Sequence, residues 1–180
     1  MVYILLGNGF EETEAVAPID LLRRAGIEVL TVGIQGKLIE GGHGIRVQAD
    51  ICLDEMDLSK MEMIVLPGGL GGVASIRSSK AAMDAIAYAH QNGKLIGAIC
   101  AGPTVLADLK ITDSKTVTCY PGCEKDMGKA RVVENAACAT DGKIITGTSA
   151  GCAIPFGLAL ITALKGRDAA NMIAQQIVIR

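Results

Sequence analysis

One cysteine of this chain follows a short apolar segment and precedes a helix-like one, where its sulfur could act as a nucleophile. Cys100 comes directly after the apolar run 95–99 and before Ala101, Gly102 and Pro103. A strand that enters a helix through one residue resembles a nucleophile elbow, whose strained turn holds a reactive side chain above a sheet. N–H groups at the helix N-terminus favour a thiolate. We therefore expect a lowered thiol pKa, and a fall from ~8.5 to ~6 would correspond to about 3.4 kcal/mol. The alternative is a small, buried and inert cysteine.

The elements that must position this cysteine follow from alternating apolar and amphipathic stretches. We expect strands over residues 2–6, 27–32, 63–66, 95–99, 116–118, 136–140 and 143–146, with Asp141 and Gly142 as a two-residue turn. Helical spacing covers residues 12–25, 80–91, 101–109, 155–164 and 167–176, and residues 36–48 form an irregular hairpin. Buried strands alternating with helices predict an α/β fold with a parallel sheet, in a single domain over residues 1–180.

Three segments should meet at one end of that sheet. Ligand sites in such folds lie beyond the carboxyl ends of the strands. Segments 7–14, 67–72 and 99–103 each follow a predicted strand, and we expect them to converge on one site.

Composition excludes several classes of function. Lys plus Arg number 17 and Asp plus Glu number 19, so a net charge of −2 gives no electrostatic footprint for nucleic acid. The N-terminal apolar run ends at Asn8, far short of the ~20 residues that cross a bilayer, and no basic leader precedes it. We expect a cytoplasmic protein without membrane or nucleic-acid partners. Its six cysteines would then stay reduced, and the lone pair Cys119 and Cys123 lacks the further ligands of a zinc site.

Four motifs occur in an order and spacing typical of one family. They are Gly-Phe-Glu-Glu-Thr-Glu at 9–14, Asp-Leu-Leu-Arg-Arg-Ala-Gly at 20–26, Val-Leu-Pro-Gly-Gly at 65–69 and Ala-Ile-Cys-Ala-Gly-Pro at 98–103. On these motifs the chain resembles the DJ-1/ThiJ/PfpI superfamily, on its DJ-1/YajL-like branch. The resemblance implies a flavodoxin-like three-layer sandwich with a mostly parallel central sheet.

The same resemblance implies roles for individual residues. Cys100 matches the family's nucleophilic, oxidation-sensitive cysteine, and Glu14 matches the acid that hydrogen-bonds its sulfur. Gly69 and Ala101 match residues whose N–H groups form an oxyanion-hole-like pocket, which Gly68 adjoins. Physical chemistry agrees, because two negative charges avoid one dry pocket and Glu14 should therefore keep its proton. The alternative for Glu14 is a solvated helix-start residue, the role that we expect for Glu11 and Glu12.

Two departures from the family pattern affect catalysis. The protease-like branch carries a histidine after the cysteine, where this chain has Ala101. The chain's only histidines are His43 and His90, and His90 ends a predicted surface helix, so we do not expect peptidase activity. Tyr120 stands where close relatives of DJ-1 carry a histidine; it can donate a hydrogen bond but does not titrate near pH 7.

Other candidate residues keep two interpretations each. His43 replaces an arginine that lies near the site and dimer interface of relatives, and it is either a polar group of the site or a surface histidine. Ser149 either contacts substrate or caps the helix 155–164, with capping favoured. Cys119 and Cys123 could resolve a sulfenic acid on Cys100 as a disulfide.

Two functions compete for the same thiolate. The first is a cofactor-independent glyoxalase or deglycase acting on reactive dicarbonyls, for example methylglyoxal to lactate, or on their adducts. The second is an oxidative-stress sensor or redox-regulated chaperone that works through a Cys100 sulfinate. No phosphate-binding G-x₄-G-K-[ST] motif is present, and no cofactor is expected. The family resemblance also implies a homodimer, for which the helix near Glu12 offers apolar surface at Ala15, Val16, Pro18 and Ile19.

Overall fold

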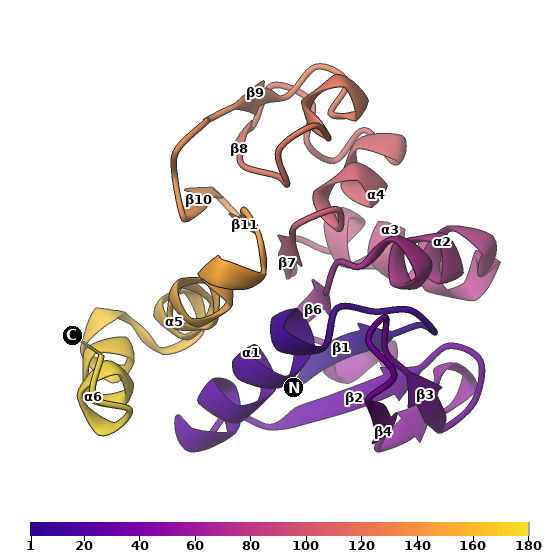
Figure 1. Cartoon of the computed structure of the whole chain (residues 1–180), viewed down its shortest axis with the longest axis horizontal. Coiled ribbons are helices and arrows are strands. Elements are labelled where there is room, and N and C mark those ends of the chain that lie inside the picture. Colours follow the sequence, from indigo (N-terminus) through magenta and orange to yellow (C-terminus); the bar gives the residue numbers. More distant parts are fainter. Residues whose placement is uncertain (180) are drawn as a thin grey trace.

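Parallel strands form the centre of one sheet in the computed structural model, which describes residues 1–179 (Figure 1). The spatial order is β10-β11-β7-β6-β1-β2-β5, and β10 with β11 is the antiparallel pair. The strands are β1 (Val2–Leu6), β2 (Val29–Gly33), β5 (Ile51–Cys52), β6 (Met63–Leu66), β7 (Leu95–Ile99), β10 (Cys138–Asp141) and β11 (Ile144–Gly147). Numbered in chain order, the central strands β1, β2, β6, β7 and β11 follow the flavodoxin-like order 2-1-3-4-5, whose switch point lies between β1 and β6.

Helices cover both faces of this sheet, because side chains of each strand alternate between two cores. Val2, Ile4 and Leu6 of β1 pack with α1 (Glu12–Arg24), α5 (Ala153–Lys165) and α6 (Arg167–Gln176). Tyr3 and Leu5 pack with the opposite helices, α2 (Leu70–Ser78), α3 (Lys80–Gln91) and α4 (Pro103–Asp108). This confirms the three-layer sandwich, and it explains why β1 is apolar at every position.

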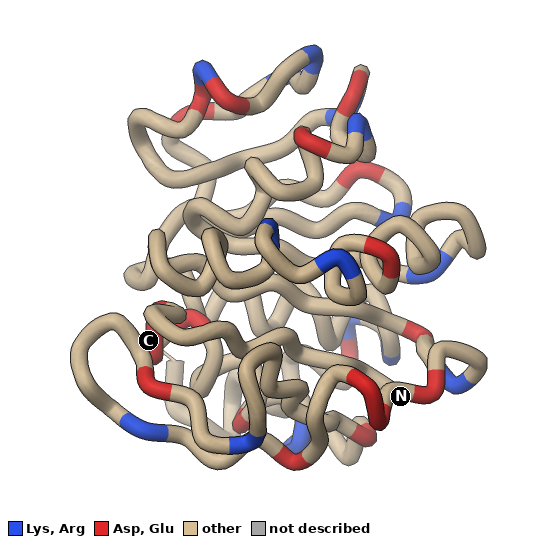
Figure 2. The backbone as a smooth tube through the Cα atoms, turned by 90° about the vertical axis from the view of Figure 1, so that its right-hand side faces the viewer, with Lys and Arg blue, Asp and Glu red and all other residues tan. Residues whose placement is uncertain are grey.

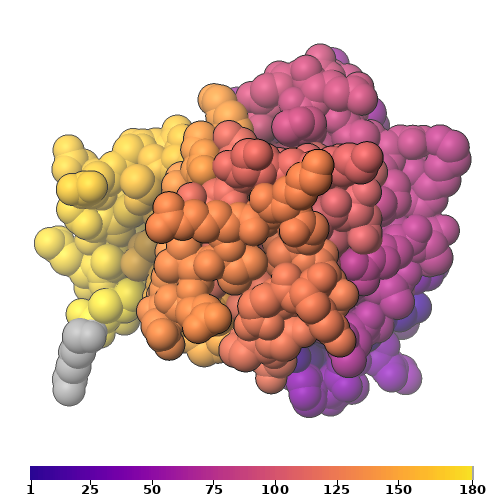
Figure 3. Space-filling model, turned by 90° about the horizontal axis from the view of Figure 1, so that it is seen from above, coloured from indigo at the N-terminus to yellow at the C-terminus, as the bar shows by residue number. Residues whose placement is uncertain are grey.

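Short strands and 3₁₀ turns lie outside the main sheet. A hairpin of β3 (Leu38–Glu40) and β4 (Arg46–Gln48) stands beside the N-terminal end of α1, where the sequence predicted an irregular hairpin. β8 (Thr116–Val117) pairs with β9 (Arg131–Val132). Figure 3 shows this β8–β10 region, in orange, between the C-terminal helices and α2 with α3. Single 3₁₀ turns are η1 (Leu53–Glu55), η2 (Leu58–Lys60), η3 (Glu124–Asp126) and η4 (Ala150–Cys152).

Two local predictions were wrong. Asp141 pairs with Ile144, so the hairpin turn is Gly142-Lys143 instead of Asp141-Gly142, with Gly142 at φ 63°. Helix α2 begins inside the glycine-rich segment, where no helix was expected. A Cβ on Gly72 would lie 2.7 Å from the Cα of Phe10, so the close contact between α2 and the loop after β1 requires a glycine at this position. Glycine has a low helix propensity, and the sequence pattern therefore did not predict a helix here.

Charged residues of both signs are interspersed along the chain (Figure 2). Among residues 1–179, no helix combines the length and the apolar character that crossing a membrane requires.

Candidate active site

Cys100 occupies a strained turn at the carboxyl end of β7. Its φ is 65°, a left-handed conformation that costs a residue with a β-carbon on the order of 1–3 kcal/mol. Backbone hydrogen bonds hold the turn: the Cys100 N–H donates to Gly147 and its carbonyl accepts from the Tyr120 N–H, both at 2.9 Å. Gly102 completes the turn, because a Cβ there would lie 2.7 Å from the carbonyl oxygen of Leu66. The predicted elbow is therefore present and held from both sides.

Glu14 reaches the same point from the first turn of α1. Its side chain is buried, with the residue 1% exposed, and Oε2 accepts a 2.9 Å hydrogen bond from the Gly68 N–H. Oε1 has no hydrogen-bond partner among the described residues. A carboxyl oxygen that is buried without a donor favours the protonated acid.

Gly68 is the residue at which the acid and the thiol meet. A Cβ on Gly68 would lie 2.5 Å from Glu14 Oε2 and 2.7 Å from Cys100 Cβ. Gly68 was predicted for the oxyanion and substrate-binding pocket; in the structure its N–H donates to Glu14 instead, and its lack of a side chain leaves room for Glu14 and Cys100.

Burial raises the pKa of both titratable groups of this pair. Burial raises the pKa of Glu14 to about 7. Burial, and then the charge of Glu14, raise the pKa of Cys100 to about 12, against hydrogen bonds from the N–H groups of Ala101 and Gly69 that lower it. The lowered thiol pKa expected from the sequence was therefore wrong while Glu14 is ionised, because the helix-start donors act against burial and a neighbouring charge.

The pair titrates as one unit. Between pH values of about 7 and 12 it holds one proton and one negative charge. When Glu14 keeps that proton, the charge lies on sulfur, facing the N–H groups of Ala101 and Gly69. Chemically, a thiolate beside a protonated acid and two N–H donors is an arrangement that can serve as a nucleophile, an acid and an oxyanion hole.

An open cavity of about 530 Å³ gives small molecules access to the sulfur. It is lined by Glu11, Glu14, His43, Gly69, Leu70, Cys100, Ala101, Tyr120, Cys123, Ser149, Ala150 and Gly151. All three predicted loops contribute, together with the β3–β4 turn and segments 120–123 and 149–151. The convergence expected at the carboxyl ends of the strands is confirmed.

Most predicted site residues lie in this lining, and Gly68 lies behind it. Tyr120 is 49% exposed at the cavity wall. Ser149 precedes η4 and makes no capping bond; its hydroxyl donates to the sulfur of Cys152, so the favoured capping interpretation was wrong. Cys123 lines the cavity, whereas Cys119 is buried in a separate small core.

His43 lines the cavity, and its ring pairs with acidic side chains of α1 and the residue before it. It lies in the β3–β4 turn with its side chain 69% exposed, and Nδ1 is 2.9 Å from Glu12 Oε2 and 3.7 Å from Glu11 Oε2. Hydrogen bonding to Glu12 raises the pKa of His43. Both interpretations of His43 hold at once, because it is a surface histidine that also borders the cavity.

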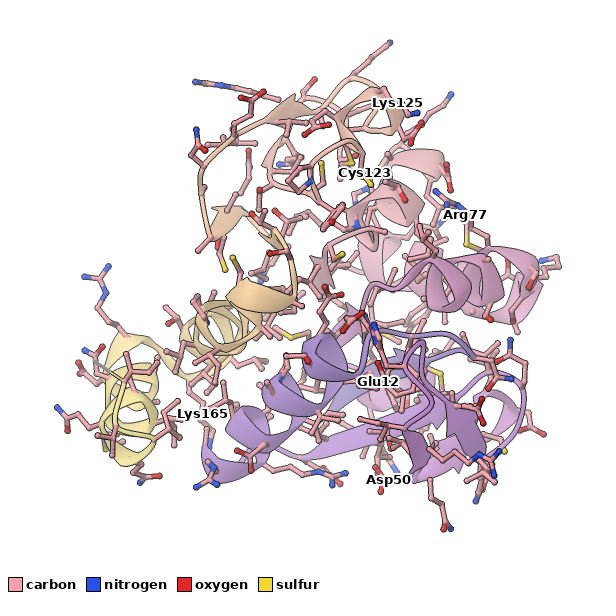
Figure 4. All side chains as sticks on the ribbon, in the orientation of Figure 1. Glu12, Asp50, Arg77, Cys123, Lys125 and Lys165 are labelled. Carbon is pink, nitrogen blue, oxygen red and sulfur yellow. The ribbon has the colours of Figure 1, made fainter. Side chains whose placement is uncertain are left out.

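Glu11 and Glu12 are not the solvated residues that the sequence predicted. Glu11 lines the cavity. Glu12 is 6% exposed and accepts from the N–H groups of His43 at 2.8 Å and Ile45 at 3.4 Å (Figure 4). Although burial raises it, these bonds and the His43 ring lower the pKa of Glu12 to about 2. The run of acids just after a glycine loop was the only sequence signal for these roles.

Two groups of side chains bring three potential metal ligands together. One is Glu11, Glu12 and His43, and the other is Cys52, Asp54 and Glu55, each with ligand atoms within 4.8 Å of one another. In the first group, the hydrogen bonds from His43 and Ile45 already satisfy Glu12.

Comparison with known proteins agrees with this fold. The model of the DJ-1/PfpI family matches residues 1–163. The Drosophila melanogaster protein dj-1beta is 32% identical over 178 residues, 98% of this chain and 95% of the relative. Its crystal structure superposes with a TM-score of 0.94, covering 99% of this chain and 97% of that one, at 31% identity. A Pyrococcus abyssi protein named as a deglycase is 31% identical over 131 residues, 73% of this chain and 78% of the relative.

Proposed function

This chain belongs to the DJ-1/PfpI family, and on that premise we propose that it is a cofactor-independent cysteine enzyme for reactive dicarbonyls or their adducts. Cys100 is the nucleophile and Glu14 the acid and base. One observation carries the proposal: the two groups meet at Gly68, below an open cavity, with an unpartnered Glu14 oxygen. The P. abyssi relative named as a deglycase supports the substrate class.

With methylglyoxal, the reaction begins on the aldehyde carbon. The Cys100 thiolate adds to this carbon, and protonated Glu14 gives its proton to the aldehyde oxygen, which forms a hemithioacetal. The Glu14 carboxylate then removes the hydrogen from that carbon as a proton and returns it to the neighbouring carbon, while the hydroxyl proton of the hemithioacetal moves to the ketone oxygen. The aldehyde carbon is thereby oxidised to a thioester, while the ketone is reduced to an alcohol.

Hydrolysis completes the cycle without a cofactor. Water attacks the thioester, lactic acid leaves with the Cys100 thiolate re-formed, and Glu14 takes up the remaining proton of the water. N–H groups of Gly69 and Ala101 stabilise the negative oxygen that forms during each addition, which is the role of an oxyanion hole. Overall, one methylglyoxal and one water give one lactic acid.

The test is lactate formation from methylglyoxal by wild type and by Cys100→Ala. We expect wild type to form lactate and the variant to lose at least a hundredfold in kcat/KM, since the variant lacks the sulfur that meets Glu14 at Gly68. Cys52→Ala is the matched control, because Cys52 does not line the cavity. Lactate formation that survives Cys100→Ala would rule out this function.

A second function is oxidant sensing through Cys100. Peroxide would convert the thiolate to a sulfinate, and the proton on Glu14 would hydrogen-bond a sulfinate oxygen; the unpartnered Oε1 favours this candidate. We expect mild peroxide to add two oxygens at Cys100 before any other cysteine, as read by peptide mass. A mass loss of two hydrogens linking Cys100 to Cys123 would instead assign a resolving role to Cys123. Oxidation spread over all six cysteines would exclude the sensor.

We also propose a homodimer in a reducing compartment such as the cytoplasm. A groove on the outer side of α1 is lined by Glu12, Thr13, Val16, Ala17, Asp20 and Ile45. Val16 is 47% and Ile45 57% exposed, whereas Ala15, Pro18 and Ile19 are buried within the protomer. The apolar surface therefore comes from Val16 and Ile45. Light scattering should give twice the 18.6 kDa chain mass, and Val16→Glu should give one chain mass.

A further inference from the structure

The cavity above Cys100 is lined by acids without a free cation. Glu11 and Glu14 contribute carboxyl groups, and His43 is the one basic side chain of the lining. Within the described part of the chain, the lining includes neither lysine nor arginine. A small molecule that enters therefore meets acidic groups at the mouth and at the floor.

The charge of His43 is already offset. Its ring is 2.9 Å from Glu12 Oε2, and Glu12 is a carboxylate stabilised by backbone N–H groups. Because the His43 ring lies closer to Glu12 than to Glu11, at 2.9 Å against 3.7 Å, the Glu11 side chain at the mouth has no basic partner of its own in the lining. The side chain of Glu11 is 22% exposed, which leaves it open to the cavity.

Cations just outside the lining do not compensate. Arg77, labelled in Figure 4, donates to Asp108 at 2.7 Å and to Thr104 at 2.8 Å, so its charge is paired. The turn beside Cys123 continues into η3, which has two acids and one lysine. At the floor, the Cys100–Glu14 pair carries one negative charge during the proposed reaction.

We propose that this cavity selects uncharged or cationic carbonyl compounds over anionic ones, and that Glu11 is the residue that sets this selectivity. The inference rests on the proposed function, since it names the substrate class of the same site. It favours methylglyoxal, glyoxal and their adducts on lysine or arginine side chains. It disfavours aldehydes that carry a carboxylate or phosphate next to the reacting carbon.

The magnitude follows from Coulomb's law. A carboxylate held ~6 Å from Glu11, at an effective dielectric constant of ~20, meets a repulsion equivalent to a factor on the order of 100 in rate. Screening by salt and water reduces this to about tenfold at physiological ionic strength. The backbone N–H groups of Gly69 and Ala101 do not reverse the preference, because they donate to the sulfur until it attacks the substrate.

Two alkylating reagents of similar size test the inference without any turnover. Iodoacetamide is neutral and iodoacetate is anionic, and both react with a thiolate by displacing iodide. The measurement is the ratio of their rates at Cys100, by peptide mass spectrometry, divided by the same ratio for N-acetylcysteine. For wild type we expect a preference for iodoacetamide of about tenfold, shrinking as salt is raised.

Glu11→Gln should reduce that preference at least threefold, while Glu28→Gln, with the same charge change outside the cavity, should leave it unchanged. Because both reagents react with the same thiolate, a change in the thiolate fraction of Cys100 cancels in the ratio of their rates. The difference between the two variants therefore reports the charge of Glu11 at the mouth of the cavity. Equal normalised rates in wild type, or equal effects of the two variants, would overturn the inference. An enzyme that forms no lactate but keeps the preference would overturn only the proposed function.

Discussion

Glu12 and Glu14 lie two residues apart on one helix and show opposite chemistry. Both are buried, at 6% and 1% exposure. Glu12 faces the β3–β4 turn, where two backbone N–H groups and an imidazole donate to it, and its pKa falls to about 2. Glu14 faces Gly68 and Cys100, where Gly68 is its one backbone donor, and its pKa rises to about 7.

The difference shows that burial alone does not decide the state of a carboxyl group. Desolvation opposes ionisation at both residues, and the number of donors that each meets determines which form prevails. Residues two apart on a helix point about 200° away from each other, so neighbouring acids enter different surroundings. Glu12 is thus a structural anchor, while Glu14 is available to move protons.

The largest expected effect is on catalysis at Glu14. Glu14→Gln keeps the shape but removes the mobile proton, so kcat/KM for methylglyoxal should fall by about 10²–10⁴-fold. Glu28→Gln serves as the control for lost surface charge, and circular dichroism checks that the variant is folded. A fall of less than tenfold would assign the proton transfer to another group.

The pH dependence of kcat/KM in the wild type tests whether Glu14 is the group that transfers the proton. The reaction needs the singly ionised pair, so kcat/KM should rise with pH and level off above an apparent pKa of about 7. Glu14→Gln should lose that inflection. A profile that is flat between pH 6 and 8 in the wild type would contradict the shared titration of Glu14 and Cys100.

At Glu12 the expected effect is on stability. Its folded-state pKa lies below the unfolded value of 4.5, so ionised Glu12 stabilises the fold above pH 4.5, and this contribution is lost as pH falls towards 2. Glu12→Gln should lower the free energy of unfolding by about 3 kcal/mol at pH 7, measured by urea unfolding. The two proteins should converge near pH 2; a constant difference would exclude the carboxylate as its cause.

Stability should change with the opposite sign at Glu14. Its folded-state pKa lies above the unfolded value, so the wild type loses stability as pH rises from 4.5 through 7. Relative to the wild type, Glu14→Gln should therefore gain about 3 kcal/mol between pH 4.5 and pH 8. The same urea measurements at both pH values check this, and an unchanged difference would contradict the raised pKa.

The smallest effect is expected at the exposed partner of Glu12. His43→Gln removes the ring but keeps the backbone N–H groups that hold Glu12, so it should destabilise the fold by less than a third of the effect of Glu12→Gln. Because the pKa of His43 is raised, its contribution is present below pH 6.5 and disappears as pH rises through the folded-state pKa. Thermal unfolding at pH 5.5 and 9 tests this; a larger effect at pH 9 would contradict it.

Local pattern accounts for the parts of the site that were predicted correctly. Cys100 was found because a five-residue apolar strand is followed directly by small residues and a proline, a pattern typical of a tight strand-to-helix turn. The convergence of three loops followed from a general property of parallel sheets. Bounds of several elements, including α3 at Lys80–Gln91 and α6 at Arg167–Gln176, follow from helical periodicity and agree with the structure.

The errors share a different cause. Glu11 and Glu12 each fit a routine helix-start role in sequence, and only contacts with the distant β3–β4 turn reveal what they bind. Ser149 fits a capping role too, but its hydroxyl donates to the sulfur of Cys152 and accepts no capping bond from a backbone N–H. Helix α2 was missed because its first turn contains glycines that pack against the loop after β1, a tertiary requirement that weakens local propensity. The thiol pKa was assigned the wrong direction because the helix-start donors were weighed without burial and the Glu14 charge.

By itself, the sequence determined the layered fold, the end of the sheet where chemistry occurs, and the cysteine that carries it, because these depend on periodicity and on steric rules along the chain. The family resemblance had already indicated Glu14 as the acid that keeps a proton, whereas tertiary structure alone decided which acid anchors a turn and what charge faces the cavity. Those properties depend on how many donors and charges from remote segments surround each group. Hydrogen bonds and Coulomb interactions act across space, and their partners here lie 31 to 54 positions apart.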